Sequence, residues 1–147
     1  MNANWIELRE EAEKLPLGHI GKLYAAEVQR LEYKQCHTRA NKFKFKTHTL
    51  ELPDALKLLS NLLYEFGETG SVKVKLKSTD VHRFAGAHYN AKTRTIHFPF
   101  AHINTRTLLH EFSHHLHRVN NFPGSTHGDE FCDIQDMVFT SALKRIK

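Results

Sequence analysis

Three residues near position 110 have the types and the spacing of a catalytic metal site. His110, Glu111 and His114 spell HExxH, and four residues along a helix, about 400° of rotation, bring the two histidine rings to one face. From there both rings can reach a single zinc ion at the roughly 2.1 Å of a Zn–N bond. Glu111 lies about 100° around the helix, badly placed to be a ligand but close enough to meet a water molecule at the metal. The motif therefore predicts hydrolysis by activated water, with Glu111 as the catalytic base.

A catalytic zinc site needs a third protein ligand and one open position. His115 lies about 140° around the helix from the first histidine and is predicted to be a solvated or capping histidine. His117 lies about 10 Å farther along the axis and is predicted to be a surface histidine, with a place lining the cleft as the alternative. A carboxylate from Glu130 or Asp133 is another possibility. His127 is favoured, because the turn-rich stretch NNFPGST brings the chain back and delivers it at the start of the next helix; the alternative is that it only caps that helix.

The HExxH motif falls within a helix predicted from about Thr105 to Val119. This helix directly follows a predicted strand hairpin, with arms near Ala85–Tyr89 and Thr93–Phe98. Four apolar residues give the helix a face to bury: Leu108, Leu109, Phe112 and Leu116. The motif is therefore expected on a helix that packs against a sheet.

The other elements alternate between helical and strand spacing. The sequence predicts helices over Asn4–Leu15, Leu23–Gln35, from Pro53 to the stop at Gly67, and from about Gly128 to Ile146, the last capped by Thr126. The second of these helices has its spacing at Leu23, Ala26, Arg30/Leu31 and Lys34. Helices, then strands, then two helices indicate one α+β domain over residues 1–147.

Two lysine-rich stretches read as strands with one apolar and one cationic face. Phe43 and Phe45 alternate with lysines in RANKFKFKTHT, as do the apolar residues of SVKVKLK. The basic residues are Lys42, Lys44, Lys46, Lys73, Lys75 and Lys77. A strand with one face in the core shows the same alternation, so contact with DNA through these faces is a possible rather than a necessary interpretation.

Bulk composition fits a globular protein with a mild basic excess. The chain of 147 residues has 21 Lys+Arg against 16 Asp+Glu. Its two cysteines, Cys36 and Cys132, form no CxxC pair, which favours a reducing cytoplasm. The first residues are acidic and amphipathic, unlike a signal peptide. A membrane span needs about 18 consecutive apolar residues, and no stretch approaches this length, so no membrane association is expected.

The motif region resembles the SprT-like (Spartan-type) zinc metalloproteases. HEFSH is followed after twelve residues by HGDEF, and that family carries HExxH with a downstream HGxxF; the arm AGAHYNAKTRTIHF also resembles its sheet edge and that of small related phage and bacterial metallohydrolases. The resemblance implies a zincin-like fold, in which a small mixed sheet with an edge hairpin packs against the HExxH helix and a C-terminal helix. It implies His110, His114 and His127 as zinc ligands and Glu111 as the catalytic acid/base.

The resemblance also gives roles to two residues after the third histidine. It implies that Gly128 allows a tight approach and that Phe131 packs under the site. The match covers Gly86–Phe131 and is vague before it. No cysteine pairs provide the zinc ribbon of many family members, so the resemblance does not extend to DNA-coupled regulation of the Spartan kind.

Peptide-bond hydrolysis suits such a site, since a scissile amide needs both an electrophile and an acid for its leaving group. The resemblance implies that an extended peptide substrate pairs with the arm Thr93–Phe98 as an added strand. His88, Tyr89 and His97 are candidates to stabilise the oxyanion, although strand alternation makes structural roles the simpler interpretation.

Two alternative functions remain. One is a basic nucleic-acid-binding protein whose zinc is structural, which would require a fourth ligand such as Glu130 or Asp133. The other is a metallohydrolase of a non-peptide amide.

Overall fold

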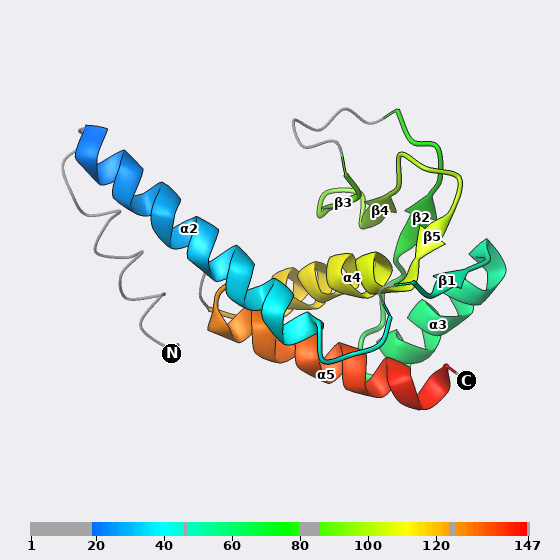
Figure 1. Cartoon of the computed structure of the whole chain (residues 1–147). Coiled ribbons are helices and arrows are strands. Elements are labelled where there is room, and N and C mark those ends of the chain that lie inside the picture. The colour runs from blue at the N-terminus through cyan, green and yellow to red at the C-terminus, as the bar shows by residue number, and fades with distance from the viewer. Residues whose placement is uncertain (1–18, 46, 80–85, 124–125, 147) are drawn as a thin grey trace.

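The computed structural model describes residues 19–45, 47–79, 86–123 and 126–146 (Figure 1). Its elements are α2 (His19–Ala40), β1 (Thr49–Leu50), α3 (Leu52–Glu65), β2 (Lys73–Lys75), β3 (His88–Asn90), β4 (Thr95–His97), β5 (Ile103–Asn104), α4 (Thr105–Val119) and α5 (Asp129–Arg145). The α+β class predicted from the sequence is confirmed. The predicted helix Asn4–Leu15 lies outside the described residues. Within the described part of the chain, no helix is both long and apolar enough to cross a bilayer.

A small mixed sheet has the strand order β2–β4–β3. β4 pairs in parallel with β2, where Val74 faces Ile96, and antiparallel with β3, where Tyr89 faces Ile96. The predicted hairpin is therefore confirmed, with shorter arms. The proposed place for a substrate strand is wrong, however, because β4 has strands on both sides and offers no open edge. β1 and β5 form a separate antiparallel pair.

Helix α4 occupies the middle of the fold (Figure 1). The mixed sheet lies on one side of it, and α5 packs along another. The helix begins at Asn104, whose side-chain oxygen accepts a 3.1 Å hydrogen bond from the Thr107 backbone N–H. Its bounds match the prediction, and its predicted apolar face is buried: Leu108, Leu109, Phe112 and Leu116 are at most 2% exposed. This burial fixes the rotation of α4 and hence the direction of its histidines.

Helix α2 lies against α5 and buries a different face from the predicted one. Val28, Cys36 and Ala40 are buried, whereas Arg30 and Lys34 are exposed. The helix is thus confirmed and its buried face corrected. Cross-helix polar contacts decide the rotation: the Arg39 guanidinium donates to Asp133 at 2.7 Å and to Asp136 at 2.6 Å, both on α5.

The predicted strand around Phe43 and Phe45 does not form in the described residues. Residues 41–44 make a turn after α2, and both rings pack against Phe139 of α5, at centroid distances of 5.1 and 5.7 Å. In this segment, phenylalanine alternates with lysine because a turn, rather than a strand, directs both aromatic side chains into the core. The strand predicted around Val74 is confirmed, with exposed Lys73 and Lys75. The stop of α3 at Gly67 is confirmed too, since this glycine has φ +73°.

Candidate metal centre

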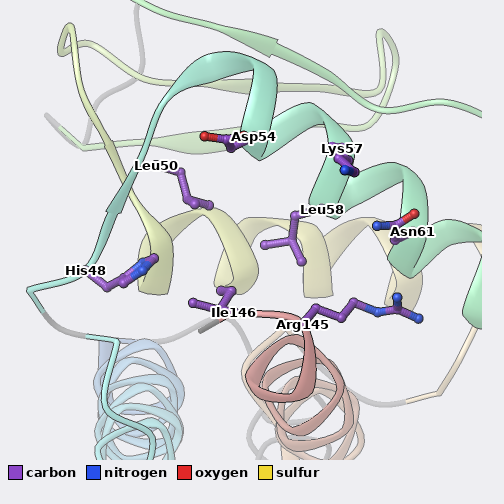
Figure 2. A pocket seen from close by; sticks show the side chains of 8 residues that line it. All are labelled: His48, Leu50, Asp54, Lys57, Leu58, Asn61, Arg145 and Ile146. Carbon is purple, nitrogen blue, oxygen red and sulfur yellow. The ribbon is translucent and has the colours of Figure 1, made fainter.

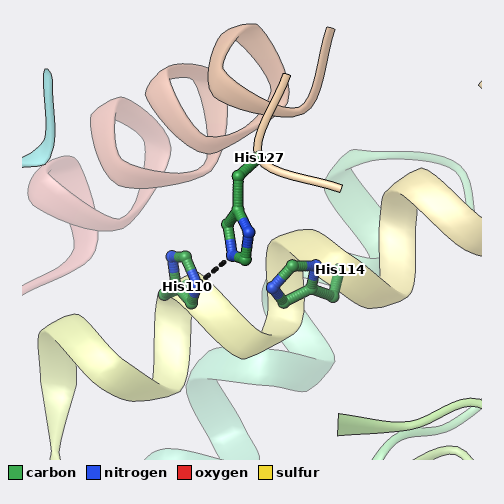
Figure 3. A group of neighbouring side chains, drawn as sticks. All are labelled: His110, His114 and His127. Atoms are coloured by element: carbon green, nitrogen blue, oxygen red, sulfur yellow. Dashed lines mark hydrogen bonds between the residues drawn. The ribbon is translucent and has the colours of Figure 1, made fainter. Parts of the chain in front are cut away.

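Three histidines from two segments converge in space (Figure 3). His110 and His114 lie one turn apart on α4, and His127 reaches toward them from the chain just ahead of α5. One ligand nitrogen from each ring lies within 4.8 Å of the other two. The structure therefore brings together all three histidines that the sequence selected as metal ligands.

The spacing fits a shared ion. Two ligands of one tetrahedral zinc ion stand about 3.4 Å apart when each bond is about 2.1 Å. The Nε2 atoms of His110 and His127 are 3.2 Å apart. Burial lowers the pKa of His110 to about 4, and burial together with the neighbouring His110 lowers that of His114 well below its usual range. Both imidazoles are therefore neutral at pH 7, the form that binds a metal.

The backbone at His127 directs its ring to the cluster. His127 has φ +71°, a left-handed conformation that few non-glycine residues adopt, although histidine does so more readily than most. Gly128 has φ −74° and ψ −174°, an extended conformation open to any residue. The backbone conformation of Gly128 therefore does not require glycine. The residue with the unusual, left-handed conformation is His127. Gly128 is also the N-cap of α5, so the predicted cap at Thr126 is wrong.

Phe131 supports the cluster from the first turn of α5. It is fully buried, and its ring stacks on His114 at a centroid distance of 4.3 Å and stands edge-on to His110 at 5.3 Å. This is the position that the resemblance implied. A large apolar ring here keeps water from one side of the imidazoles and restricts their rotation.

Glu111 is buried beside the cluster, with 8% of its surface exposed. Burial raises the pKa of its carboxyl to about 8, while a hydrogen bond from the Tyr89 backbone opposes the shift. A nearby cation would favour the carboxylate form. The side chain therefore has the properties of a group that accepts and returns a proton near neutral pH.

Helix α2 contributes side chains to the centre that were not predicted from the sequence. The Tyr33 ring stands edge-on to His127 at a centroid distance of 5.0 Å, and the His37 ring stacks at 6.4 Å from His110. Arg106 donates from Nη2 to His37 Nδ1 at 3.1 Å. Helix α2 therefore forms a wall of the site that no spacing within the motif indicates.

The two carboxylates considered as metal ligands do not join the three histidines. Asp133 pairs with Arg39 at 2.7 Å, and Glu130 is exposed. Among the described residues, the group that could hold an ion contains the three histidines and no fourth protein ligand. The donor set thus matches three ligands plus an open position rather than a closed structural site.

Two predicted surface histidines of α4 are in fact buried. His115 is 1% exposed and shares a 2.6 Å hydrogen bond between its Nδ1 and the Tyr89 hydroxyl. His117 is 7% exposed and donates from Nε2 to the Pro123 carbonyl at 3.2 Å. Both residues lie outside the cluster of three histidines, as predicted, but not in solvent, because the sheet and the following loop cover those faces.

The hairpin residues proposed for the oxyanion make structural contacts. The Tyr89 hydroxyl is bonded to His115, and the Nδ1 of His97 lies 2.8 Å from the Ser78 hydroxyl. The rings of His88 and His97 stack on each other at 4.9 Å. These contacts agree with the structural interpretation of all three residues.

Figure 2 shows a pocket of the described structure, which has a volume of about 330 Å³. It is lined by His48, Leu50, Asp54, Lys57, Leu58, Asn61, Arg145 and Ile146. It shares no residue with the three histidines, and its Arg145 is already paired with Glu65 at 2.9 Å.

Comparisons of the chain with family models, curated proteins and solved structures find no match. The SprT-like assignment therefore stays a prediction that rests on the motif and on the geometry of the site.

Proposed function

We propose that this protein is a zinc-dependent metallopeptidase of the SprT-like type with a zincin-like fold. The observation that carries the proposal is the convergence of three imidazoles, with no fourth protein ligand among the described residues, beside a buried glutamate. His110, His114 and His127 would hold the ion. When bound, zinc supplies a Lewis acid that lowers the pKa of water and polarises a carbonyl.

In this proposal Glu111 moves the proton. Its carboxylate would accept a proton from the attacking water and return it to the leaving amine, which requires a pKa near the working pH. Burial of the Glu111 side chain and the hydrogen bond from the Tyr89 backbone would keep it in one place during both transfers. β3 is the outer strand of the sheet next to α4, so an extended peptide would lie along β3 rather than along the enclosed β4.

Nucleic-acid binding with a structural zinc is the second candidate. Exposed Lys73 and Lys75 on β2 support it, whereas the basic strand expected at residues 42–46 is absent from the described chain and no closing ligand accompanies the histidines there. A non-peptide amide substrate would use the same centre.

The experiment is metal analysis of the purified protein, followed by hydrolysis assays on unfolded protein, on peptides and on simple amides. Each assay is run with and without a chelator and with single-stranded DNA added. We expect bound zinc in a 1:1 ratio and chelator-sensitive peptide cleavage. Glu111→Gln should keep zinc and lose cleavage by more than about 100-fold.

Glu130→Gln is the matched control, since it makes the same change at an exposed position and should leave zinc and cleavage unaltered. Loss of zinc together with activity in Glu111→Gln would make this residue a ligand or a structural group. A zinc protein that cuts only non-peptide amides, or that binds DNA without hydrolysis, would replace the proposal with one of its alternatives.

A further inference from the structure

Gln135 is a fully buried polar residue at the contact between three helices. It lies on α5, in an otherwise apolar stripe with Phe131 and Val138. Its side chain meets Cys36 of α2 on one side and His110 of α4 on the other. A buried amide in such a position needs hydrogen-bond partners for both its oxygen and its nitrogen.

The contacts fix the orientation of the Gln135 amide. Its Nε2 lies 3.3 Å from the carbonyl oxygen of Cys36, and a carbonyl can only accept, so the amide nitrogen must be on that side. The Oε1 atom then faces Nδ1 of His110 at 2.7 Å and also accepts from the Cys36 thiol at 3.5 Å.

This orientation also determines the tautomer of His110. An amide oxygen only accepts hydrogen bonds, so the proton between the two side chains belongs to Nδ1 of His110. A neutral imidazole protonated at Nδ1 has its lone pair on Nε2. That Nε2 is the atom 3.2 Å from His127.

We propose that Gln135 is a positioning residue, which holds His110 in the Nδ1–H tautomer with Nε2 directed at the metal. The inference rests on the metal centre in the proposed function. Histidines that bind metals commonly donate their other ring N–H to a carbonyl or carboxylate oxygen, which orients the ring and raises its basicity. Through its second contact, Gln135 also ties the orientation of His110 to the packing of α2.

The first test replaces Gln135 with methionine, which keeps a similar length and removes the acceptor. Zinc affinity is measured by competition with a chromogenic chelator, on protein whose folding is checked by circular dichroism. We expect Gln135→Met to bind zinc about 10- to 100-fold more weakly. Gln35→Met is the matched control: Gln35 also bridges α2 and α5, through a 3.3 Å bond to Asp129, and makes no hydrogen bond to a histidine of the cluster in the described structure. Its zinc affinity should equal that of the wild type.

A second variant separates positioning from simple support of the helix contact. Gln135→Glu keeps an acceptor oxygen for His110 but loses the donor to the Cys36 carbonyl, as Gln135→Met also does. Positioning predicts that glutamate restores zinc affinity to within a few-fold of the wild type. Equal weakening in both variants, or unchanged affinity in Gln135→Met, would overturn the inference.

The tautomer can be read directly in the wild-type protein, so this test does not depend on how a substitution changes zinc binding. Long-range ¹H–¹⁵N spectra of the metal-free protein, with the His110 signals identified by their loss in His110→Gln, should show the proton on Nδ1. A proton on Nε2 would contradict the proposal. This result does not depend on peptide cleavage: a wild-type protein that binds no zinc defeats the proposed function, while the tautomer remains measurable.

Discussion

Helix α4 carries four histidines, and their surroundings divide them into two pairs. His110 and His114 turn their ring nitrogens toward His127, so that three possible ligand atoms gather within 4.8 Å. His115 and His117 are more deeply buried than the first pair, yet each is bonded to one protein group, the Tyr89 hydroxyl and the Pro123 carbonyl respectively. Because of these separate contacts, the rings of His115 and His117 do not point toward a common site.

The comparison shows that burial of a histidine does not identify a metal site. In the first pair, ring nitrogens face other imidazole nitrogens, as His110 Nε2 faces His127 Nε2 at 3.2 Å, and two such nitrogens need a proton or a cation between them. In the other pair the nearest polar atoms are a hydroxyl and a carbonyl, which satisfy the ring without any ion. The two pairs should therefore respond differently to substitution, metal and pH.

The largest difference is expected in metal binding. His127→Ala removes one of three ligands and should weaken zinc binding by more than about 100-fold, beyond the effect of changing an outer group. His117→Ala, a like change at a buried histidine outside the cluster, should leave zinc affinity within about two-fold once folding is confirmed. Isothermal titration or chelator competition measures both. Unchanged stoichiometry and affinity in His127→Ala would remove this residue from the site.

The next effect is on the stability of the metal-free protein. Burial raises the pKa of Glu111 to about 8, above its unfolded value near 4.5, so the folded state binds an extra proton between these pH values. Stability should therefore fall as pH rises from 4.5 to 8. Glu111→Gln carries no charge, so at pH 8.5 it should be more stable than the wild type by up to about 4 kcal/mol, with little difference at pH 4.5.

Urea unfolding at the two pH values measures this difference in the free energy of unfolding. Glu130→Gln again serves as the exposed control. Added zinc should shrink the advantage of Glu111→Gln at pH 8.5, because a cation stabilises the neighbouring carboxylate. An equal difference between the wild type and Glu111→Gln at both pH values would show that the carboxyl is not the titrating group.

The smallest effect belongs to the second pair. Tyr89→Phe removes the hydroxyl that bonds His115 and leaves a buried ring nitrogen without that partner, at a cost of about 1–3 kcal/mol in unfolding free energy. Zinc affinity should not change. Thermal unfolding and zinc titration of the same samples test the two statements together. A large loss of zinc affinity would show that His115 supports the metal centre, and the two pairs would then not differ as described.

The sequence predicted those parts of the site that depend on one helix. Spacing along α4 places His110 and His114 together, and the apolar residues around them determine which face is buried. The turn before α5 identified His127, since a compact connection between two helices returns the chain to its starting point. These features follow from local geometry and short connections.

Packing between distant segments explains the errors. Nothing near Phe43 indicates that the turn carrying it would pack on Phe139 instead of forming a strand. Helix α2 was predicted, but its buried face depends on partners about 100 positions away, such as Asp133 for Arg39. Gln135 left one detectable signal, a single amide within an apolar helical stripe, which on its own does not say which histidine it meets.

The three histidines belong to two segments, and this has a thermodynamic consequence. An ion bound by all of them would join the middle of α4 to His127, two residues before α5, and the unfolded chain would lack that arrangement. Bound zinc would then add RT ln(1 + [Zn²⁺]/Kd) to the free energy of unfolding, which is about 2.7 kcal/mol when free zinc is 100 times Kd. The melting temperature would then rise with the free zinc concentration, and a chelator would lower it to that of the metal-free protein.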